Sequence, residues 1–203
     1  MRPLVILALV GLPAALSAQQ LSLSPQIGFY IPTENLYRLT STGTSGDDFK
    51  LEAGPSFGAR LGLWFGSRFG IEASGSYVPT TFQFGASGSS PTTQDARLFV
   101  GTGQAVLYLL PRTSIVSLFL NGGVGVVSRG GVAFTGAAKS SDVGGVVGAG
   151  ASLRLGGIQL TAGADLLGYR ATYQGSQSTA QELTQKDISI KLGFGIPIGP
   201  GGR

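Results

Sequence analysis

Residues 188–198 read ISIKLGFGIPI: every even position is apolar, and every odd position is polar, glycine or proline. Side chains of a β-strand point alternately to opposite faces, so this segment has one hydrophobic face and one polar or glycine face. Its length is that of a tilted strand that crosses a bilayer. The stretch therefore predicts a strand with one face against lipid.

The same alternation recurs along the chain and predicts an antiparallel all-β fold. The fourth predicted strand alternates least clearly, because Leu107 and Leu109 oppose its phase. A hairpin-like Asn121-Gly122-Gly123 in the fifth is interpreted as part of one strand, since two shorter strands would not cross a membrane. The predicted strands are residues 21–31, 50–65, 69–78, 96–110, 115–128, 143–155, 158–168 and 188–198. In the fourth, the residues expected to face outward are Leu98, Val100, Val106, Tyr108 and Leu110.

The connections between these strands alternate in length. Tight turns at residues 66–68, 111–114 and 156–157 separate long polar stretches at 32–49, 79–95, 129–142 and 171–187. Short turns on one side and long loops on the other are typical of bacterial outer-membrane barrels. Two turns keep the hydrophobic faces in phase, but the turn at 111–114 would pair outward Leu110 with inward Ile115 unless the loop takes one more residue.

Composition favours a membrane barrel over a soluble one. Only 12% of residues are charged, and the less hydrophobic strand face is mostly Gly, Ser, Thr and Gln. That face would be a poor surface in water, whereas small residues suit the narrow interior of an eight-stranded barrel. A closed barrel also pairs its backbone groups within the protein, as lipid requires. The predicted fold class is an all-β, eight-stranded antiparallel up-and-down transmembrane β-barrel.

Aromatic residues gather near the predicted strand ends, where they would form girdles at the membrane interfaces. The alternative is that aromatic residues are simply frequent in strands. The residues concerned are Trp64, Phe65, Phe69, Tyr108 and Phe194 on the turn side, and Phe29, Tyr30, Tyr77, Tyr169 and Tyr173 on the loop side.

The N-terminus has the features of a secretory signal peptide. Arg2 supplies a positive charge, residues 4–12 form an apolar core, and residues 14–18 contain the small residues of a cleavage region. We expect cleavage after Ala18, which divides the chain into a signal peptide, residues 1–18, and a barrel domain, residues 19–203. An uncleaved membrane anchor is disfavoured because the apolar core is short and Pro13 interrupts it.

Through this architecture, residues 20–198 resemble the small outer-membrane β-barrel family, which includes the OmpA-like transmembrane domain and its eight-stranded relatives. The local motif is KLGFGIPI at residues 191–198, which is similar to the last-strand signal read by the barrel-assembly machinery. The chain differs from the family pattern in lacking a terminal aromatic residue. The resemblance implies location in the cell outer membrane after export, and an assembly signal at Lys191, Gly193, Ile196 and Ile198.

Charged residues at inward positions predict the content of the lumen. A buried charge needs a partner, so we expect a salt-bridged interior that plugs the barrel. The alternative is an ion or solute path lined by the same side chains. The predicted barrel-interior network consists of Glu52, Arg60, Glu72, Arg97, Arg154, Asp165 and Lys191.

Few residues suggest catalysis or cofactor binding. The chain contains no histidine and no cysteine, and the enzymes of the resembled family depend on a histidine acid or base. Calcium binding by Asp47, Asp48 and Glu34 is one alternative, but we interpret these residues as a solvated loop tip. Basic residues are scattered, which argues against nucleic-acid binding. We therefore expect no enzyme activity, no metal and no cofactor.

The predicted role is structural or surface-binding: envelope integrity, adhesion or ligand contact through long extracellular loops. One alternative is a narrow channel for small or apolar solutes, and another is a soluble exported barrel that binds a lipid-like ligand. The expected partners are outer-membrane lipid, lipopolysaccharide and the barrel-assembly machinery, and the barrel is expected to be a monomer.

Overall fold

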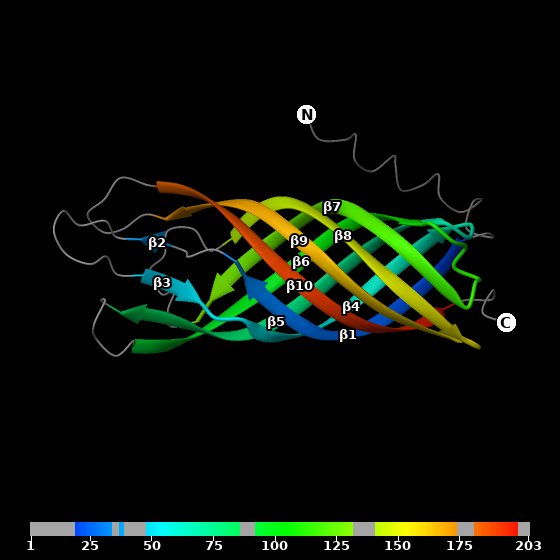
Figure 1. The fold of residues 1–203 in the computed structure, drawn as a ribbon, viewed down its shortest axis with the longest axis horizontal. Coiled ribbons are helices and arrows are strands. Elements are labelled where there is room, and N and C mark those ends of the chain that lie inside the picture. The colour runs from blue at the N-terminus through cyan, green and yellow to red at the C-terminus, as the bar shows by residue number, and fades with distance from the viewer. Residues whose placement is uncertain are drawn as a thin grey trace, which may run out of the picture.

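The computed structural model describes residues 19–33, 37–38, 48–85, 92–131, 141–173 and 181–198. The predicted signal peptide lies outside these residues. Eight long strands run the length of the molecule, and two short ones, β2 and β3, lie at one end (Figure 1). The strands are β1 (Gln19–Pro32), β2 (Tyr37–Arg38), β3 (Asp48–Leu51), β4 (Gly54–Phe65), β5 (Phe69–Gly85), β6 (Thr92–Tyr108), β7 (Val116–Gly130), β8 (Ser141–Leu155), β9 (Ile158–Tyr173) and β10 (Gln181–Ile198).

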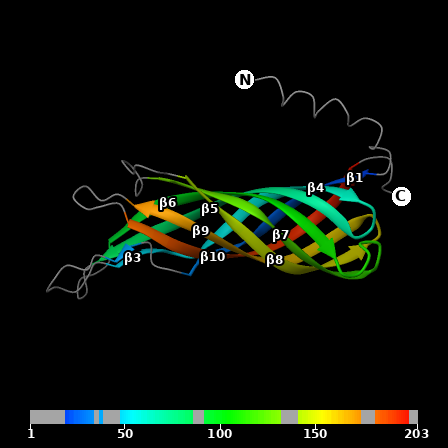
Figure 2. The same ribbon diagram turned by 90° about the horizontal axis from the view of Figure 1, so that it is seen from above.

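The eight long strands close on themselves, as Figures 1 and 2 show. Each pairs antiparallel with the next long strand along the chain, from β1 with β4 to β9 with β10. The ring is completed by β1 and β10, in which Leu21 lies opposite Ile198. The predicted eight-stranded antiparallel barrel is thus confirmed. No helix in the described ranges is long and apolar enough to cross a membrane.

Two of the three predicted tight turns are confirmed. Gly66 and Gly156 adopt φ angles of 79° and 62°, values that favour glycine. They bring Phe65 opposite Phe69 and Leu155 opposite Ile158. The third connection is longer than predicted and covers residues 109–115 between β6 and β7. The segment around Asn121 is one continuous strand, also as predicted.

Alternation of side chains places an apolar surface on the outside of the barrel. Large apolar residues of this surface remain exposed, for example Ile27 at 58% and Val143 at 72% of their full area. The predicted phase holds for β1, β5, β7, β8, β9 and β10, and for β4 beyond Gly54. A continuous apolar exterior of this kind is unusual for a protein in water and suits a lipid environment.

The predicted phase of β6 was wrong. Phe99 and Leu107 are exposed, whereas Val100 and Val106 are buried inside the barrel, as are Leu98 and Tyr108. The register agrees, because Leu107 lies opposite outward Leu120 of β7. Large apolar residues lie on both faces of β6, since the lumen itself is apolar near both of its ends. The strand therefore lacks the contrast between faces on which the prediction relied.

The aromatic girdles were also predicted too broadly. Trp64 and Tyr108 on the turn side, and Tyr30 and Tyr169 on the loop side, are buried in the barrel interior. Other members of the predicted girdles do lie on the outside, as Phe29, Phe65, Phe69, Tyr77 and Phe194 do. Aromatic side chains therefore serve both the outer surface and the interior.

The strands extend further toward the long loops than predicted. β10 begins at Gln181, and β5 and β6 continue to Gly85 and from Thr92. Residues of the predicted second strand instead form β3 and β4, separated at Glu52 and Ala53. At that break the register with β5 changes by one residue, as in a β-bulge.

We predict that the close contact of β1 with β10 requires glycine at position 28. A Cβ atom there would lie against the carbonyl oxygen of Ile190, so Gly28→Ala should destabilise the barrel by about 1–3 kcal/mol. Urea unfolding followed by the fluorescence of Trp64, the single tryptophan, measures this. Gly103→Ala is the matched control, because a Cβ there meets no atom, and equal stability of the two variants would contradict the prediction.

Candidate functional site

The candidate site is the lumen of the barrel, and its middle contains an ion pair from adjacent strands. Arg60 of β4 lies opposite Ser74 and diagonal to Glu72 of β5. Its Nη1 donates to both carboxylate oxygens of Glu72, at 3.0 and 3.3 Å. The Gln26 amide of β1, turned with its oxygen toward the guanidinium, accepts from Arg60 Nε at 2.7 Å. These side chains thus link the neighbouring strands β1, β4 and β5 on the lumen side of the sheet.

A second cluster at the same level surrounds Asp165 of β9. Lys191 Nζ lies 2.9 Å from Asp165 Oδ2, and Asn121 Nδ2 donates to Asp165 Oδ1 at 2.8 Å. Asn121 also donates to Gln104 Oε1 at 2.6 Å, and Gln104 donates to Thr102 Oγ1 at 3.1 Å. The cluster therefore joins β6, β7, β9 and β10.

These two clusters together form the polar layer of the lumen. Its charged residues are two cations, Arg60 and Lys191, and two anions, Glu72 and Asp165, so their formal charges cancel. All four line a cavity of about 20 Å³, which has space for roughly one water molecule. The polar layer is therefore a nearly filled, neutral network.

Aromatic side chains fill the lumen toward the tight turns. The rings of Trp64 and Tyr108 meet edge to face with centroids 5.4 Å apart, and Tyr108 also contacts Phe119 at 5.4 Å. Trp64 Nε1 donates to Ser22 Oγ at 2.9 Å. The guanidinium carbon of Arg112 lies 3.8 Å from the Trp64 ring centroid, a cation–π contact.

The long connection between β6 and β7 holds Arg112 over this end of the barrel. Arg112 N donates to Ser67 O at 2.8 Å, and its Nη2 donates to Gln159 Oε1 at 3.1 Å. Ser114 N donates to Pro111 O at 2.9 Å within the connection. The sequence predicted a simple tight turn here. The longer connection instead holds the cation Arg112 over the turn end of the lumen.

Toward the long loops the lumen becomes apolar. The side chains of Val78, Leu98 and Val127 are essentially inaccessible to solvent. They belong to one contiguous buried cluster, whose other members are Tyr30, Leu51, Ala96, Val100, Val146, Leu167, Tyr169 and Ala171. This apolar layer fills the part of the interior between the polar layer and the long loops.

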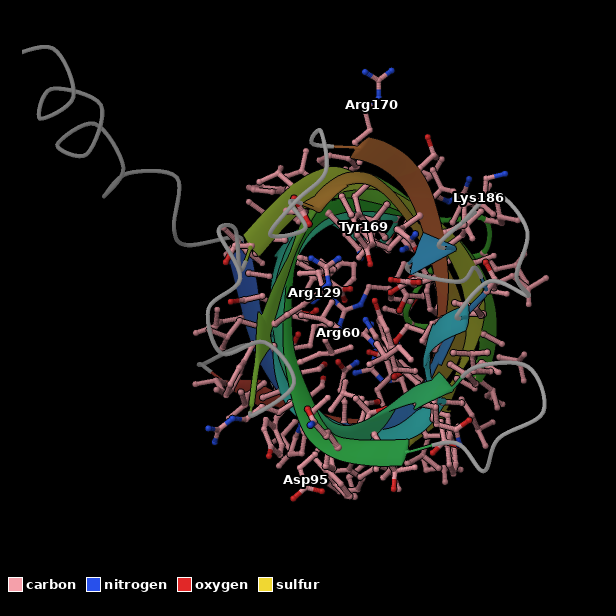
Figure 3. The ribbon with its side chains drawn as sticks, turned by 90° about the vertical axis from the view of Figure 1, so that its left-hand side faces the viewer. Arg60, Asp95, Arg129, Tyr169, Arg170 and Lys186 are labelled. Carbon is pink, nitrogen blue, oxygen red and sulfur yellow. The ribbon has the colours of Figure 1, made fainter. Side chains whose placement is uncertain are left out.

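A buried group of polar side chains lies among these apolar residues. Arg129 Nη1 is 2.6 Å from Asp142 Oδ2, and both side chains are at most 3% exposed. Arg129 also lies over the Tyr169 ring at 5.2 Å. The hydroxyls of Tyr169 and Tyr30 donate to Asp187 Oδ2, the former at 2.7 Å. Figure 3 shows Arg129 and Tyr169 pointing into the lumen, as Arg60 does.

The structure distributes the predicted network residues unevenly. Arg60, Glu72, Asp165 and Lys191 meet in the polar layer. Arg154 stands apart on the inward face near the turn end, where its Nε donates to Gly156 O at 3.4 Å.

Two predicted network residues are not in the lumen. Arg97 is exposed on the outer face, because the phase of β6 is inverted. Glu52 lies at the break between β3 and β4, and its carboxylate accepts from Thr81 Oγ1 and Gln83 Nε2. Both partners share the β5 face of exposed Tyr77. The prediction that Arg97 and Glu52 belong to the interior was wrong.

Sequence reasoning missed Arg112, Arg129, Asp142 and Asp187 as interior residues. The sequence prediction assigned all four to connections, whereas the structure leaves only Arg112 in one and places the other three in β7, β8 and β10. For Asp187 a signal was present, since it continues the odd-numbered inward face of Ser189 and Lys191.

The predicted assembly-signal residues all lie in β10. Lys191 and Gly193 face the lumen, and Ile196 and Ile198 face outward. The described residues contain no group of three metal-ligating side chains, whereas Glu34 and Asp47, considered above for calcium, lie outside them.

Comparisons with known proteins agree with this architecture. The model of the outer membrane protein beta-barrel domain family matches residues 4–199. The structure of OprG from Pseudomonas aeruginosa is similar with a TM-score of 0.65 and 13% identity, over 90% of this chain and 97% of that one. Neisserial surface protein A gives 0.53 and 13%, over 89% and 97%. Outer membrane protein W of E. coli gives 0.53 and 12%, over 89% and 98%. Curated protein sequences gave no match.

We predict that Asp165 stabilises the polar layer. Asp165→Asn removes the partner of Lys191 and should lower the free energy of unfolding by about 3 kcal/mol, because an uncompensated charge remains in the interior. Urea unfolding of the folded barrel measures the change. Asp95→Asn is the control, since Asp95 is exposed on the outside (Figure 3), and a similar loss in both variants would argue against the role of Asp165.

Proposed function

Because this chain belongs to the outer membrane protein beta-barrel domain family, we propose that it is a sealed membrane scaffold that presents its loop end for structural or binding contacts. Envelope integrity, adhesion and contact with a ligand are the roles that such a scaffold serves. Export by the N-terminal signal and recognition of β10 by the barrel-assembly machinery are parts of the same proposal.

The filled lumen is the observation that carries the proposal. An aromatic layer, a neutral polar layer and an apolar layer follow one another from the turn end to the loop end. An ion crossing the barrel would have to displace the Arg60–Glu72 and Lys191–Asp165 pairs, and then lose its hydration among apolar side chains. Such an interior supports stability rather than conduction.

The extended strands at the loop end provide surface for contacts. There the outer face changes from apolar to polar, with exposed Thr93, Asp95 and Arg97 on β6 and exposed Thr184 and Lys186 on β10. Polar residues on the outer face of a membrane barrel mark the region beyond the hydrocarbon. We infer that this rim and the connections above it meet external ligands and lipopolysaccharide.

The interior offers no basis for catalysis. Glu72, Asp142 and Asp165 each bind a cation of the lumen, and the chain contains no histidine. Catalytic acids and bases require access to a substrate, which the buried pairs lack. We therefore propose a non-enzymatic protein.

A second candidate function is passage of small apolar solutes, and the apolar layer favours it. Val100, Val127 and their neighbours make the loop-side half of the lumen apolar, which an apolar solute would enter at a lower cost in free energy than an ion. Uptake of a hydrocarbon into proteoliposomes, reduced by Val100→Gln but unchanged by Val126→Gln on the outer face, would support this function over a sealed scaffold.

We predict that the purified barrel gives no steady ion conductance in planar bilayers, because the polar layer is filled and neutral. Folded protein, verified by its heat-dependent gel shift, is reconstituted and the current recorded.

Arg60→Glu should unfold more readily, and the exchange Arg60→Glu/Glu72→Arg should recover part of the stability. Stepwise currents whose ion selectivity changes with Arg60→Glu, without loss of stability, would instead establish a pore.

A further inference from the structure

Two cations stand next to each other on the outside of the barrel wall. Arg170 of β9 lies opposite Thr184 of β10, and Lys186 is two residues from Thr184. Diagonal positions of this kind are about 7–8 Å apart in an antiparallel pair, within reach of long side chains. Both residues are exposed, and Figure 3 shows them pointing away from the barrel, opposite to Arg60 and Arg129.

Arg170 and Lys186 have no carboxylate partner among the side chains that the structure describes. They also make no side-chain hydrogen bond in this part of the chain. In contrast, Arg60, Arg129 and Lys191 in the lumen each have a carboxylate partner. Neighbouring like charges repel each other, so this pair of positions favours an anion that both side chains can reach.

The exposed apolar residues on the outside of the barrel form an apolar belt. The position of the two cations relative to this belt indicates the kind of anion. On β9 the outward positions below Arg170 are Gly168 and then exposed Leu166, and on β10 the next outward residue below Lys186 is Ile188. Exposed Val143 belongs to the adjacent β8. The cations therefore lie at the loop-side edge of the belt, where the phosphates of a lipid in the surrounding leaflet lie.

We propose that Arg170 and Lys186 form a binding site for the phosphates of an anionic glycolipid of the loop-side leaflet, the lipopolysaccharide type. Arginine binds phosphate through paired N–H groups and lysine as a point charge, while the acyl chains lie against the belt below. The site rests on the proposed function, since it names the residues through which the scaffold contacts lipopolysaccharide. It faces the membrane, so a lipid headgroup is its occupant rather than free phosphate.

The experiment compares binding of diphosphorylated lipid A with binding of its dephosphorylated form to the detergent-solubilised barrel, by native mass spectrometry. The variant Arg170→Gln/Lys186→Gln should bind diphosphorylated lipid A about 30-fold more weakly than the wild type, from about tenfold per 1.4 kcal/mol and about 1 kcal/mol per cation. Binding of the dephosphorylated lipid should not change. High salt should reduce the difference between the two proteins.

Arg68→Gln is the control, because it removes an exposed arginine at a tight turn, at the other end of the barrel from the proposed site. It should bind the phosphorylated lipid like the wild type. Glu182→Gln removes the acidic residue at the register position opposite Thr172, and should bind at least as tightly as the wild type. Folding of every variant is checked by the heat-dependent gel shift.

Equal affinity of the wild type and Arg170→Gln/Lys186→Gln, or an equal loss in the control, would overturn the site. Competition by inorganic phosphate at concentrations similar to those of the lipid would show an ion site rather than a lipid site, and would also overturn it. These outcomes are separate from the conductance measurement: a conducting barrel would refute the sealed scaffold and leave the lipid site in place, whereas a failed lipid site would leave a sealed barrel.

Discussion

The pairing of β1 with β10 is the contact on which the rest of the structure depends. Backbone N–H and C=O groups that face hydrocarbon must bond within the protein, and a sheet satisfies them all only when it closes. Closing eight strands creates a narrow lumen, whose volume side chains must fill. Close approach of the strands in turn requires glycine at positions such as Gly28 and Gly58, where a Cβ would meet backbone of the adjacent strand. Glycine content and the filled interior are therefore both consequences of closure.

The same constraint explains the order of the layers in the lumen. A buried charge is costly unless a partner and hydrogen bonds compensate it, and the two ion pairs of the polar layer lie between an aromatic layer and an apolar layer that exclude water from either side. Low local polarity strengthens each paired interaction and raises the cost of breaking it. The polar layer thus involves seven of the eight long strands, from Gln26 on β1 to Lys191 on β10. Loss of one charged member would leave its partner on another strand unpaired.

The architecture could be predicted from the sequence because the outer apolar face and the tight turns give two independent measures of register. They agreed at Gly66 and Gly156, and the structure has both pairings. They disagreed at the turn that begins with Pro111, and the predicted phase of the preceding strand β6 was wrong. Large apolar residues lie on both faces of β6, so hydrophobicity alone does not show which face points outward. Arg97 was misplaced for that reason. Glu52 was misplaced because a break of two residues between β3 and β4 shifts the register without any signal in the alternation. Arg129 and Asp142 were missed because polar residues that pair inside a barrel have the same composition as a loop.

The placement of charge separates what stabilises this barrel from what is available to its surroundings. Arg60, Arg129 and Lys191 in the lumen have carboxylate partners on other strands, which neutralise their charge within the fold. Arg170 and Lys186 lie outside, next to each other, without such partners in the described chain. In a soluble barrel, two adjacent cations at the edge of an apolar surface would have no ligand to bind. In a barrel that crosses an asymmetric membrane, the lipid phosphates lie at the edge of the apolar belt, where these cations are. The interior therefore accounts for stability, and the outer rim is where an interaction with the envelope has to be sought.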